Sequence, residues 1–180
     1  IGIGVDATSL TLVPLDSSGC VLSNLPEFAG QEHAQIKLWK RHTANTQAQE
    51  ALDLAKKREE KFLQRTGRSV SSEWMLPKLM EMRDQAPEIY YHMDLAFDLC
   101  DFLTYRLTGK IKRSIGSMSY KCLWAADLGF PPREYLNSLR TDLGNEYINL
   151  LRGDICLPGE PAGVLRPELC IKYGLSSDVV

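Results

Sequence analysis

Short apolar runs alternate with amphipathic stretches along this chain, and the alternation constrains its fold more than any other feature. Runs 1–5, 11–15 and 36–39 have the length and apolar content of strands. Residues 46–66 instead space their apolar side chains as a surface helix does, and Gly67 follows as a stop signal. Strands that alternate with helices in this way indicate an α/β fold.

Start and stop signals add detail further along the chain. Serines 71–72 are N-cap candidates for a helix over WMLPKLMEMRDQ, in which Pro77 must fall in an early turn. The run LAFDLCDFLTYRLTG predicts a strand that leads into a helix ended by Gly109. Asp98 or Asp101 would cap that helix.

Both ends of the sequence lie inside an expected element. The chain begins with the strand-like run 1–5 and stops at Val180, just as a new apolar run starts. Backbone groups in the middle of an element need partners, so a natural domain seldom begins or ends there. We therefore expect the chain to be a piece of a larger protein.

Composition argues against several classes of partner. The chain has 180 residues, 44% of them hydrophobic, and a formal net charge of −2. Nucleic acids and membrane surfaces normally bind a basic face, and no apolar run approaches the roughly 20 residues that span a bilayer. The five cysteines are scattered, without a C-x-x-C pair or a Cys/His cluster. This pattern predicts reduced thiols, no metal site and a cytoplasmic location.

Polar residues follow two of the apolar runs, at points where they could line a ligand site. Asp6 to Ser9 come directly after the first run, and ligands in open α/β sheets bind just outside the carboxyl ends of strands. An ordinary turn would have the same composition. Trp39 ends another run, and its ring suits the C–H face of a sugar, although a tryptophan of the core or rim would look the same.

Two sets of basic residues are open to more than one interpretation. Lys121 lies between Tyr120 and Cys122 in GSMSYKCLW, where a lysine either reaches toward solvent or is held in a cleft as a fixed donor. Residues 40–42, Lys-Arg-His, would either bind an anion or form a solvated face. The residues alone therefore indicate an α/β chain with a candidate cleft for a polar ligand.

Seven segments, taken together, resemble one family in order and spacing. They are GIGVDAT, NLPEFAG, AQIKLWKRHTA, SSEWMLPKL, DLCDFLTYRLTGK, RSIGSMSYKCLW and PAGVLRPELCIKYGLSSDVV. The family is that of the FGGY carbohydrate kinases, and the segments LWK-x-HTA and SSEW resemble its ribulokinase branch more than xylulokinases or glycerol kinases. The resemblance runs from Ile1 to Val180.

The resemblance implies a ribonuclease H-like (actin-like ATPase) fold, with a mixed sheet and flanking helices. Residues 1–180 would be part of the N-terminal, sugar-binding domain of such a kinase. The family's phosphate hairpin, D-x-G-[ST], would precede Ile1, and the C-terminal ATPase domain would follow Val180. The catalytic aspartate that acts as base is expected beyond Val180 as well, so no catalytic residue is expected within the chain. ATP and Mg²⁺ would serve the full-length enzyme, with neither bound to residues 1–180 alone.

The implied activity is transfer of the γ-phosphate of ATP to the 5-hydroxyl of L-ribulose, in L-arabinose catabolism. Another pentulose or a polyol, such as D-ribulose or xylulose, is the alternative substrate. For the isolated chain, a non-catalytic sugar-binding domain is the alternative function. The expected partner is a small sugar, and a homodimer is the one assembly considered.

Substrate contacts are what the resemblance implies for individual residues of this sequence. Ser9 matches a position that borders the sugar, and Trp39 matches a tryptophan that forms a wall of the pocket. Lys121 matches a lysine that donates hydrogen bonds to the oxygens of the substrate. Asp6 and Glu73 lie beside these positions in the family pattern.

Arg41 departs from the family pattern, because relatives often have Asp or His there. We expect Lys40 and Arg41 to turn outward while Trp39 faces the sugar. The basic triplet 40–42 would then form the rim of the pocket.

Overall fold

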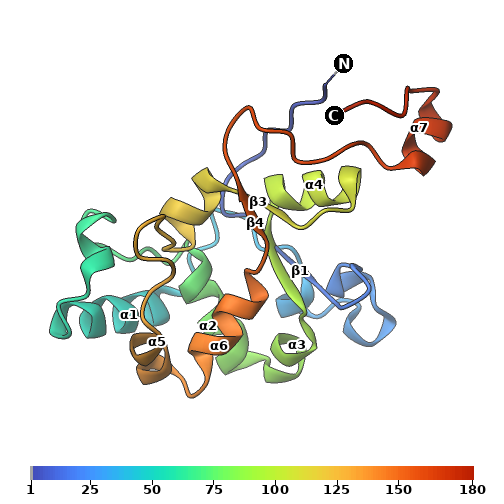
Figure 1. Cartoon of the computed structure of the whole chain (residues 1–180). Helices are drawn as coiled ribbons and strands as arrows, with labels where there is room; N and C mark the ends of the chain where they lie inside the picture. Colours follow the sequence, from blue (N-terminus) through green and yellow to red (C-terminus); the bar gives the residue numbers. More distant parts are fainter. Residues whose placement is uncertain (1) are drawn as a thin grey trace.

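The computed structural model describes residues 2–180, in which helices surround two small sheets (Figure 1). The helices are α1 (Asn45–Lys57), α2 (Met75–Gln85), α3 (Pro87–His92), α4 (Leu99–Thr108), α5 (Arg133–Leu139), α6 (Leu143–Leu150) and α7 (Pro167–Tyr173). The strands are β1 (Leu12–Leu15), β2 (Leu95–Asp98), β3 (Lys112–Ser114) and β4 (Asp154–Cys156). The α/β class predicted from the sequence is confirmed. No helix within residues 2–180 has the length and apolar character that a membrane crossing requires.

The strands form two separate pairs. β1 runs antiparallel to β2, with Leu12 opposite Asp98 and Leu15 opposite Leu95. β3 and β4 are parallel to each other. Within residues 2–180, the strands thus form one antiparallel and one parallel sheet in place of the single mixed sheet that we expected. Both pairs lie between α4 and the group of helices at the bottom of Figure 1.

The first apolar run does not form the buried strand that its composition predicted. Ile1 lies outside the described residues, and Gly2 to Val5 belong to no strand. Ile3 is 45% exposed, and its backbone N–H donates to the carbonyl of Val180 at 2.6 Å. A single hydrogen bond is too little to define a sheet, because a strand is stabilised by a row of paired backbone groups.

The run 36–39 is also not a strand. It pairs only through an isolated bridge between Lys37 and Leu12. Leu38 and Trp39 then leave the sheet and are 49% and 44% exposed. This apolar run therefore contacts the edge of β1 at one residue, Lys37, and then continues along the surface.

The helix expected over residues 46–66 is shorter and is followed by a separate 3-10 turn. α1 ends at Lys57, and the 3-10 turn covers Lys61–Gln64. Between them, Glu59 has a positive φ of 54°, and the N–H of Glu60 donates to the carbonyl of Ala55 at 2.9 Å. This bond closes the end of α1 in the way a left-handed C-terminal residue does, although no glycine is present there.

Some of the helix start and stop signals predicted for α2 and α4 are confirmed, and others are wrong. Gly109 ends α4 with a φ of 76°, and Pro77 is the third residue of α2, both as predicted. The serine caps are wrong, because Trp74 occupies the N-cap position of α2. Asp98 does occupy the N-cap position of α4, but its side chain makes no cap hydrogen bond there.

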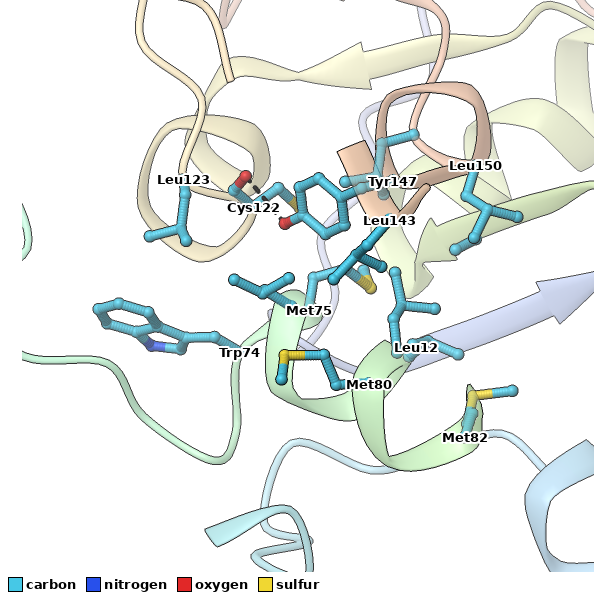
Figure 2. Packing of buried hydrophobic residues seen from close by; sticks show 14 of the residues in the cluster. Leu12, Trp74, Met75, Met80, Met82, Cys122, Leu123, Leu143, Tyr147 and Leu150 are labelled. Atoms are coloured by element: carbon cyan, nitrogen blue, oxygen red, sulfur yellow. Dashed lines mark hydrogen bonds between the residues drawn. The ribbon is translucent and has the colours of Figure 1, made fainter. Parts of the chain in front are cut away.

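The main hydrophobic core is built around α2, with side chains from α6 and from the 117–125 segment packed against it (Figure 2). Met75, Met80 and Met82 of α2 are at most 1% exposed. Tyr147 of α6 is fully buried, and its hydroxyl donates to the carbonyl of Cys122 at 3.0 Å (Figure 2). Each large apolar side chain buried in this way contributes about 1.5–3 kcal/mol to stability. The core thus fixes α2, from which the candidate site is built.

Candidate functional site

A buried lysine on α2 connects two of the segments that the sequence marked as candidate sites. Lys78 is 1% exposed, and its Nζ donates to the carbonyl oxygens of Leu10 at 2.8 Å and Leu38 at 3.0 Å. Leu10 directly follows Ser9, and Leu38 directly precedes Trp39. The structure therefore brings the segments of Ser9 and Trp39 together, far apart though they are in the sequence.

Ser9 lies at the surface on a backbone held by a carboxylate. Its hydroxyl donates to Oδ2 of Asp98 at 3.3 Å, and the same oxygen accepts the backbone N–H of Leu10 at 2.8 Å. Leu10 has a φ of 72°, a conformation that is uncommon for a branched residue. Ser9 thus presents a small exposed group on a segment whose position is set by side chains of other elements.

Trp39 is 44% exposed, so part of this residue is accessible from solvent. Arg41, two residues on, donates from Nη2 to Oε1 of Glu32 at 2.6 Å and from Nε to Thr43 Oγ1 at 2.8 Å. The hydrogen bond and charge of Arg41 hold the pKa of the Glu32 carboxyl below its usual value. Lys40 is exposed. Arg41 turns outward only in part, because its side chain is 24% exposed and its Nε also lies 3.9 Å from Oε2 of the buried Glu81. A place for Lys40 and Arg41 at the rim of a sugar pocket stays a prediction.

Glu73 contacts the segment of Trp39 by way of His42. His42 Nε2 is 3.4 Å from Oε1 of Glu73, and His42 Nδ1 is 3.5 Å from the hydroxyl of Ser72. The sequence indicated an anion site or a solvated face for residues 40–42, and it did not predict this contact of His42 with the segment that precedes α2. The sequence also did not predict Lys78, whose only signal was a lysine within the apolar stretch WMLPKLM.

The charges around Lys78 show which side chains share its surroundings. Burial lowers the pKa of Lys78 to about 8. The carboxylates of Glu73 and Asp98 act against this shift, while the positive charges of Lys37 and Arg41 add to it. Glu73 and Asp98 are therefore close enough to stabilise the buried ammonium, as opposite charges in a low-dielectric interior do.

Lys121 ends a single π-helical turn, Ser117–Lys121, of a kind that occurs frequently at functional sites. Its side chain is half-buried, and its Nζ lies 4.8 Å from the centre of the Tyr120 ring. That ring packs edge-on against Trp74, with centroids 5.4 Å apart. Trp74 directly follows Glu73, so the segments of Lys121 and Glu73 are in contact. A shared contact of Lys121 and Trp39 with one ligand stays a prediction.

Asp6 is exposed. Burial, followed by the charges of Asp101, Asp98 and Asp6, raises the pKa of the Cys100 thiol. The neighbour identified for Asp6 is thus Cys100, and a role of Asp6 in the same site as Ser9 stays a prediction.

Two hollows lie elsewhere in the described chain. One of about 560 Å³ lies between Gly2–Val5, α4 and the segment 156–165. The other, of about 450 Å³, is walled by Phe62, Trp124 and Phe130. Ser9, Trp39, Glu73 and Lys121 line neither of them. The candidate site, a wall of the chain that includes the exposed side chains of Ser9 and Trp39, is therefore separate from both of these hollows.

The side chains of residues 2–180 include no group of three or more His, Cys, Asp or Glu that could hold a metal ion. All five cysteines are free thiols. What the candidate site offers is an exposed indole, hydroxyl, carboxylate and ammonium groups, which suit a neutral polyhydroxy ligand.

Comparison with known sequences finds curated ribulokinases to which this chain is similar. The ribulokinase of Halalkalibacterium halodurans is 37% identical over 179 residues, which are 99% of this chain and 32% of that enzyme. The ribulokinase of Geobacillus thermodenitrificans is 38% identical over 175 residues, 97% of this chain and 31% of that enzyme. The chain thus spans about a third of the length of the curated relatives that it matches. No protein-family model matches the sequence.

Solved structures show the same fold. A ligand-bound xylulose kinase from Lactobacillus acidophilus matches 99% of this chain and 33% of its own with a TM-score of 0.73 and 16% identity. A gluconate kinase from the same organism matches 96% of this chain and 31% of its own with a TM-score of 0.71 and 17% identity. At this level of identity the likeness concerns the fold alone.

Proposed function

This chain is related along its whole length to the ribulokinases among the FGGY carbohydrate kinases, and on that premise we propose that it is the sugar-binding portion of a kinase that transfers the γ-phosphate of ATP to the 5-hydroxyl of L-ribulose. We assign residues 1–180 to part of the N-terminal domain of a ribonuclease H-like (actin-like ATPase) enzyme. The phosphate hairpin would precede this part and the ATPase domain would follow it. Its place would be in L-arabinose catabolism, in the cytoplasm.

The observation that supports this proposal most strongly is the position of Lys78. Lys78 bonds the carbonyls of Leu10 and Leu38, which are next in sequence to Ser9 and Trp39, and the charge of Glu73 acts on the same ammonium. This supports our proposal that Ser9, Trp39 and Glu73 border one surface. An exposed tryptophan next to small and charged hydrogen-bonding groups is the chemistry that a sugar requires, because a sugar has apolar C–H faces and polar hydroxyl edges.

The residues of this chain do not fit an ATP or magnesium site. Neither a phosphate-binding glycine loop nor, within residues 2–180, a cluster of metal ligands is present. ATP with Mg²⁺ would supply the phosphoryl group elsewhere in the full-length enzyme. We therefore assign to this chain only the binding and orientation of the sugar.

Orientation is a large part of phosphoryl transfer, because the protein contributes mainly positioning and charge stabilisation to such a reaction. In our proposal Trp39 packs against the carbon face of the sugar and Lys121 donates to its oxygens. The 5-hydroxyl then points away from this wall, toward the second domain. Closure of that domain over the wall would exclude water from the reacting groups.

A substrate panel tests the proposal. The full-length protein that contains this chain would be assayed for kcat/KM with L-ribulose, D-ribulose, xylulose and a polyol such as ribitol, at saturating ATP. The highest kcat/KM is expected for L-ribulose. A preference for another sugar would keep the kinase assignment and replace the substrate, whereas no phosphorylation of any of them would contradict the proposal.

The isolated chain has a second candidate function, that of a non-catalytic sugar-binding domain, which the lack of a metal-ligand cluster in residues 2–180 favours. A coupled assay of ADP release with L-ribulose distinguishes the two. We expect no turnover by residues 1–180 alone, so measurable turnover would contradict our division of the enzyme.

A further inference from the structure

Lys78 is buried at a place where lysine is rarely found. It is 1% exposed and lies in α2 beside Leu76 and Leu79, which are both 0% exposed. Lysine is almost never fully buried unless it has partners, because removal of an ammonium group from water is costly. An apolar side chain would fill the same space without that cost. The bonds that this ammonium makes therefore need an explanation of their own.

The two carbonyls that Lys78 bonds lie just past the point where strand pairing stops. Leu12 and Lys37 exchange both of their backbone hydrogen bonds, each of 2.9 Å. Within the described residues the pairing of these two segments goes no further than this isolated bridge. Beyond it, the carbonyls of Leu10 and Leu38 have Nζ of Lys78 as a common donor, at 2.8 and 3.0 Å. The ammonium thus links the two segments just beyond the point where their backbone pairing ends.

Leu10 has a strained backbone conformation, and side chains bond both its N–H and its carbonyl. Its φ of 72° is in the left-handed region, which costs a residue with a Cβ free energy that glycine does not lose. Its N–H donates to Asp98 Oδ2 at 2.8 Å while its carbonyl accepts from Lys78. Strained backbone persists where the surrounding structure holds it, and such positions cluster at ligand-binding sites.

We propose that Lys78 is a positioning residue that fixes the separation of Ser9 and Trp39, and with it the width of the sugar-binding surface between them. Lys78 does not contact the sugar, since its side chain is buried and its ammonium is directed at two backbone carbonyls. The inference rests on the proposed function, because the sugar is the ligand whose affinity would report a change in that separation.

The test is the Lys78→Met variant of the full-length protein that contains this chain. Methionine keeps most of the length and apolar volume of lysine but donates no hydrogen bond. We expect the KM for L-ribulose to rise by about 10-fold or more, because small misplacements of binding groups have large effects on orientation. The KM for ATP is expected to stay within about 2-fold of the wild type, since ATP is not oriented by this wall.

Lys37→Met is the matched control. Lys37 is also 1% exposed, but its Nζ lies 3.2 Å from Nδ1 of His33 and bonds neither Leu10 nor Leu38. Loss of its ammonium therefore reports what the removal of a buried lysine does to stability in general. We expect Lys37→Met to leave the sugar KM within about 2-fold of the wild type.

A second variant, Lys78→Gln, covers the case in which Lys78→Met does not fold. Glutamine is shorter but keeps an N–H₂ donor, so it should give a sugar KM between those of the wild type and Lys78→Met. A folded Lys78→Met or Lys78→Gln protein with an unchanged sugar KM would overturn the proposal. Failure of both variants to fold would also overturn it, because Lys78 would then be a requirement of the fold alone.

Hydrogen exchange separates this inference from the proposed function. In Lys78→Met, backbone amides of residues 6–12 and 36–42 should both exchange faster, while Lys37→Met should not accelerate residues 6–10. If the wild-type enzyme phosphorylates no sugar, the proposed function fails, and hydrogen exchange alone tests whether Lys78 positions the two segments. Unchanged exchange in either segment of Lys78→Met would then contradict the positioning role of Lys78.

Discussion

The carboxylate of Asp98 accepts the backbone N–H of Leu10 at 2.8 Å, so the residue that joins β2 to α4 also fixes the start of β1. Asp98 is 2% exposed and occupies the N-cap position of α4 without bonding the first turn of that helix. Its oxygen Oδ2 is used instead by Leu10 and by the hydroxyl of Ser9. One side chain therefore links the helix–strand junction to the candidate site.

Replacement of Asp98 by alanine should destabilise the chain. The N–H of Leu10 would lose its partner, and a hydrogen bond to a charged group contributes about 1.5–3 kcal/mol. Asp98→Asn keeps an oxygen acceptor of nearly the same position and should cost about 1 kcal/mol less. Urea unfolding followed by tryptophan fluorescence measures both. Equal stability of Asp98→Ala and the wild type would show that this bond does not hold the segment.

Features set by local chemistry were predictable from the sequence. Gly109 ends α4 because glycine readily adopts the left-handed conformation at a helix C-terminus, and the residues that precede it already indicate a helix. Pro77 falls in the first turn of α2 because its missing N–H is tolerated there. In both cases the residue and the few positions next to it determine the outcome.

Features set by distant partners were not predictable in the same way. Residues 36–39 have the composition of a strand, yet only Lys37 pairs with a neighbour, because β1 meets this segment at Leu12 alone. Asp98 has the composition and place of a helix cap, but the N–H of Leu10 competes for it successfully. Propensity describes what a residue can do locally and leaves its long-range partner open.

The residues of the candidate site also differ in whether the sequence could identify them. The segments of Ser9 and Trp39 were identified because they lie at the ends of apolar runs, and the family resemblance implied a role for the two residues. The structure brings these segments together through Lys78. Lys78 could not be identified from the sequence, because the residues next to it do not indicate that its ammonium bonds the carbonyls of Leu10 and Leu38. The partner of His42 was not predictable for the same reason, because Glu73 lies in another segment of the chain.

Substitution of Lys121 tests the polar side of the proposed pocket. In the full-length protein, Lys121→Ala should raise the KM for L-ribulose and lower kcat/KM by roughly 10- to 100-fold, since a charge-assisted hydrogen bond contributes about 1.5–3 kcal/mol. Steady-state kinetics with varied sugar at saturating ATP gives both values. Lys40→Ala is the control, because Lys40 is an exposed rim residue and should leave both values within about 2-fold. Unchanged KM and kcat/KM in Lys121→Ala would remove that residue from the site.

Substitution of Trp39 tests the apolar side. Trp39→Ala should raise the sugar KM by about 10-fold, because the ring would no longer shield the C–H face of the sugar from water, a contribution of order 1–2 kcal/mol. Stability should change little, since the side chain is already 44% exposed. Trp39→Phe keeps part of the aromatic surface and is expected between the two. Isothermal titration or initial-rate kinetics measures the effect, and a wild-type KM for Trp39→Ala would place the sugar elsewhere.

The pH dependence of stability tests the buried carboxyl of Asp101. Burial raises its pKa from 3.8 to about 7, against the opposing effects of the Ser114 N–H and the charge of Arg113. Between these two values the folded chain binds more protons than the unfolded chain, so the free energy of unfolding falls as pH rises from about 4 to about 7. Above about 7 the carboxyl is ionised in both states, and its contribution no longer changes with pH.

Asp101→Asn removes this titration while it keeps an oxygen for the N–H of Ser114, which bonds Oδ1 of Asp101 at 2.8 Å. The variant should therefore lose less stability than the wild type over the same pH range, by a few kcal/mol at most at about 1.4 kcal/mol per pH unit. Urea unfolding at several pH values between about 4 and about 8 gives the two curves. Asp178→Asn, at an exposed position, is the control and should follow the wild type. Parallel curves for Asp101→Asn and the wild type would mean that Asp101 titrates at the same pH in the folded and the unfolded chain.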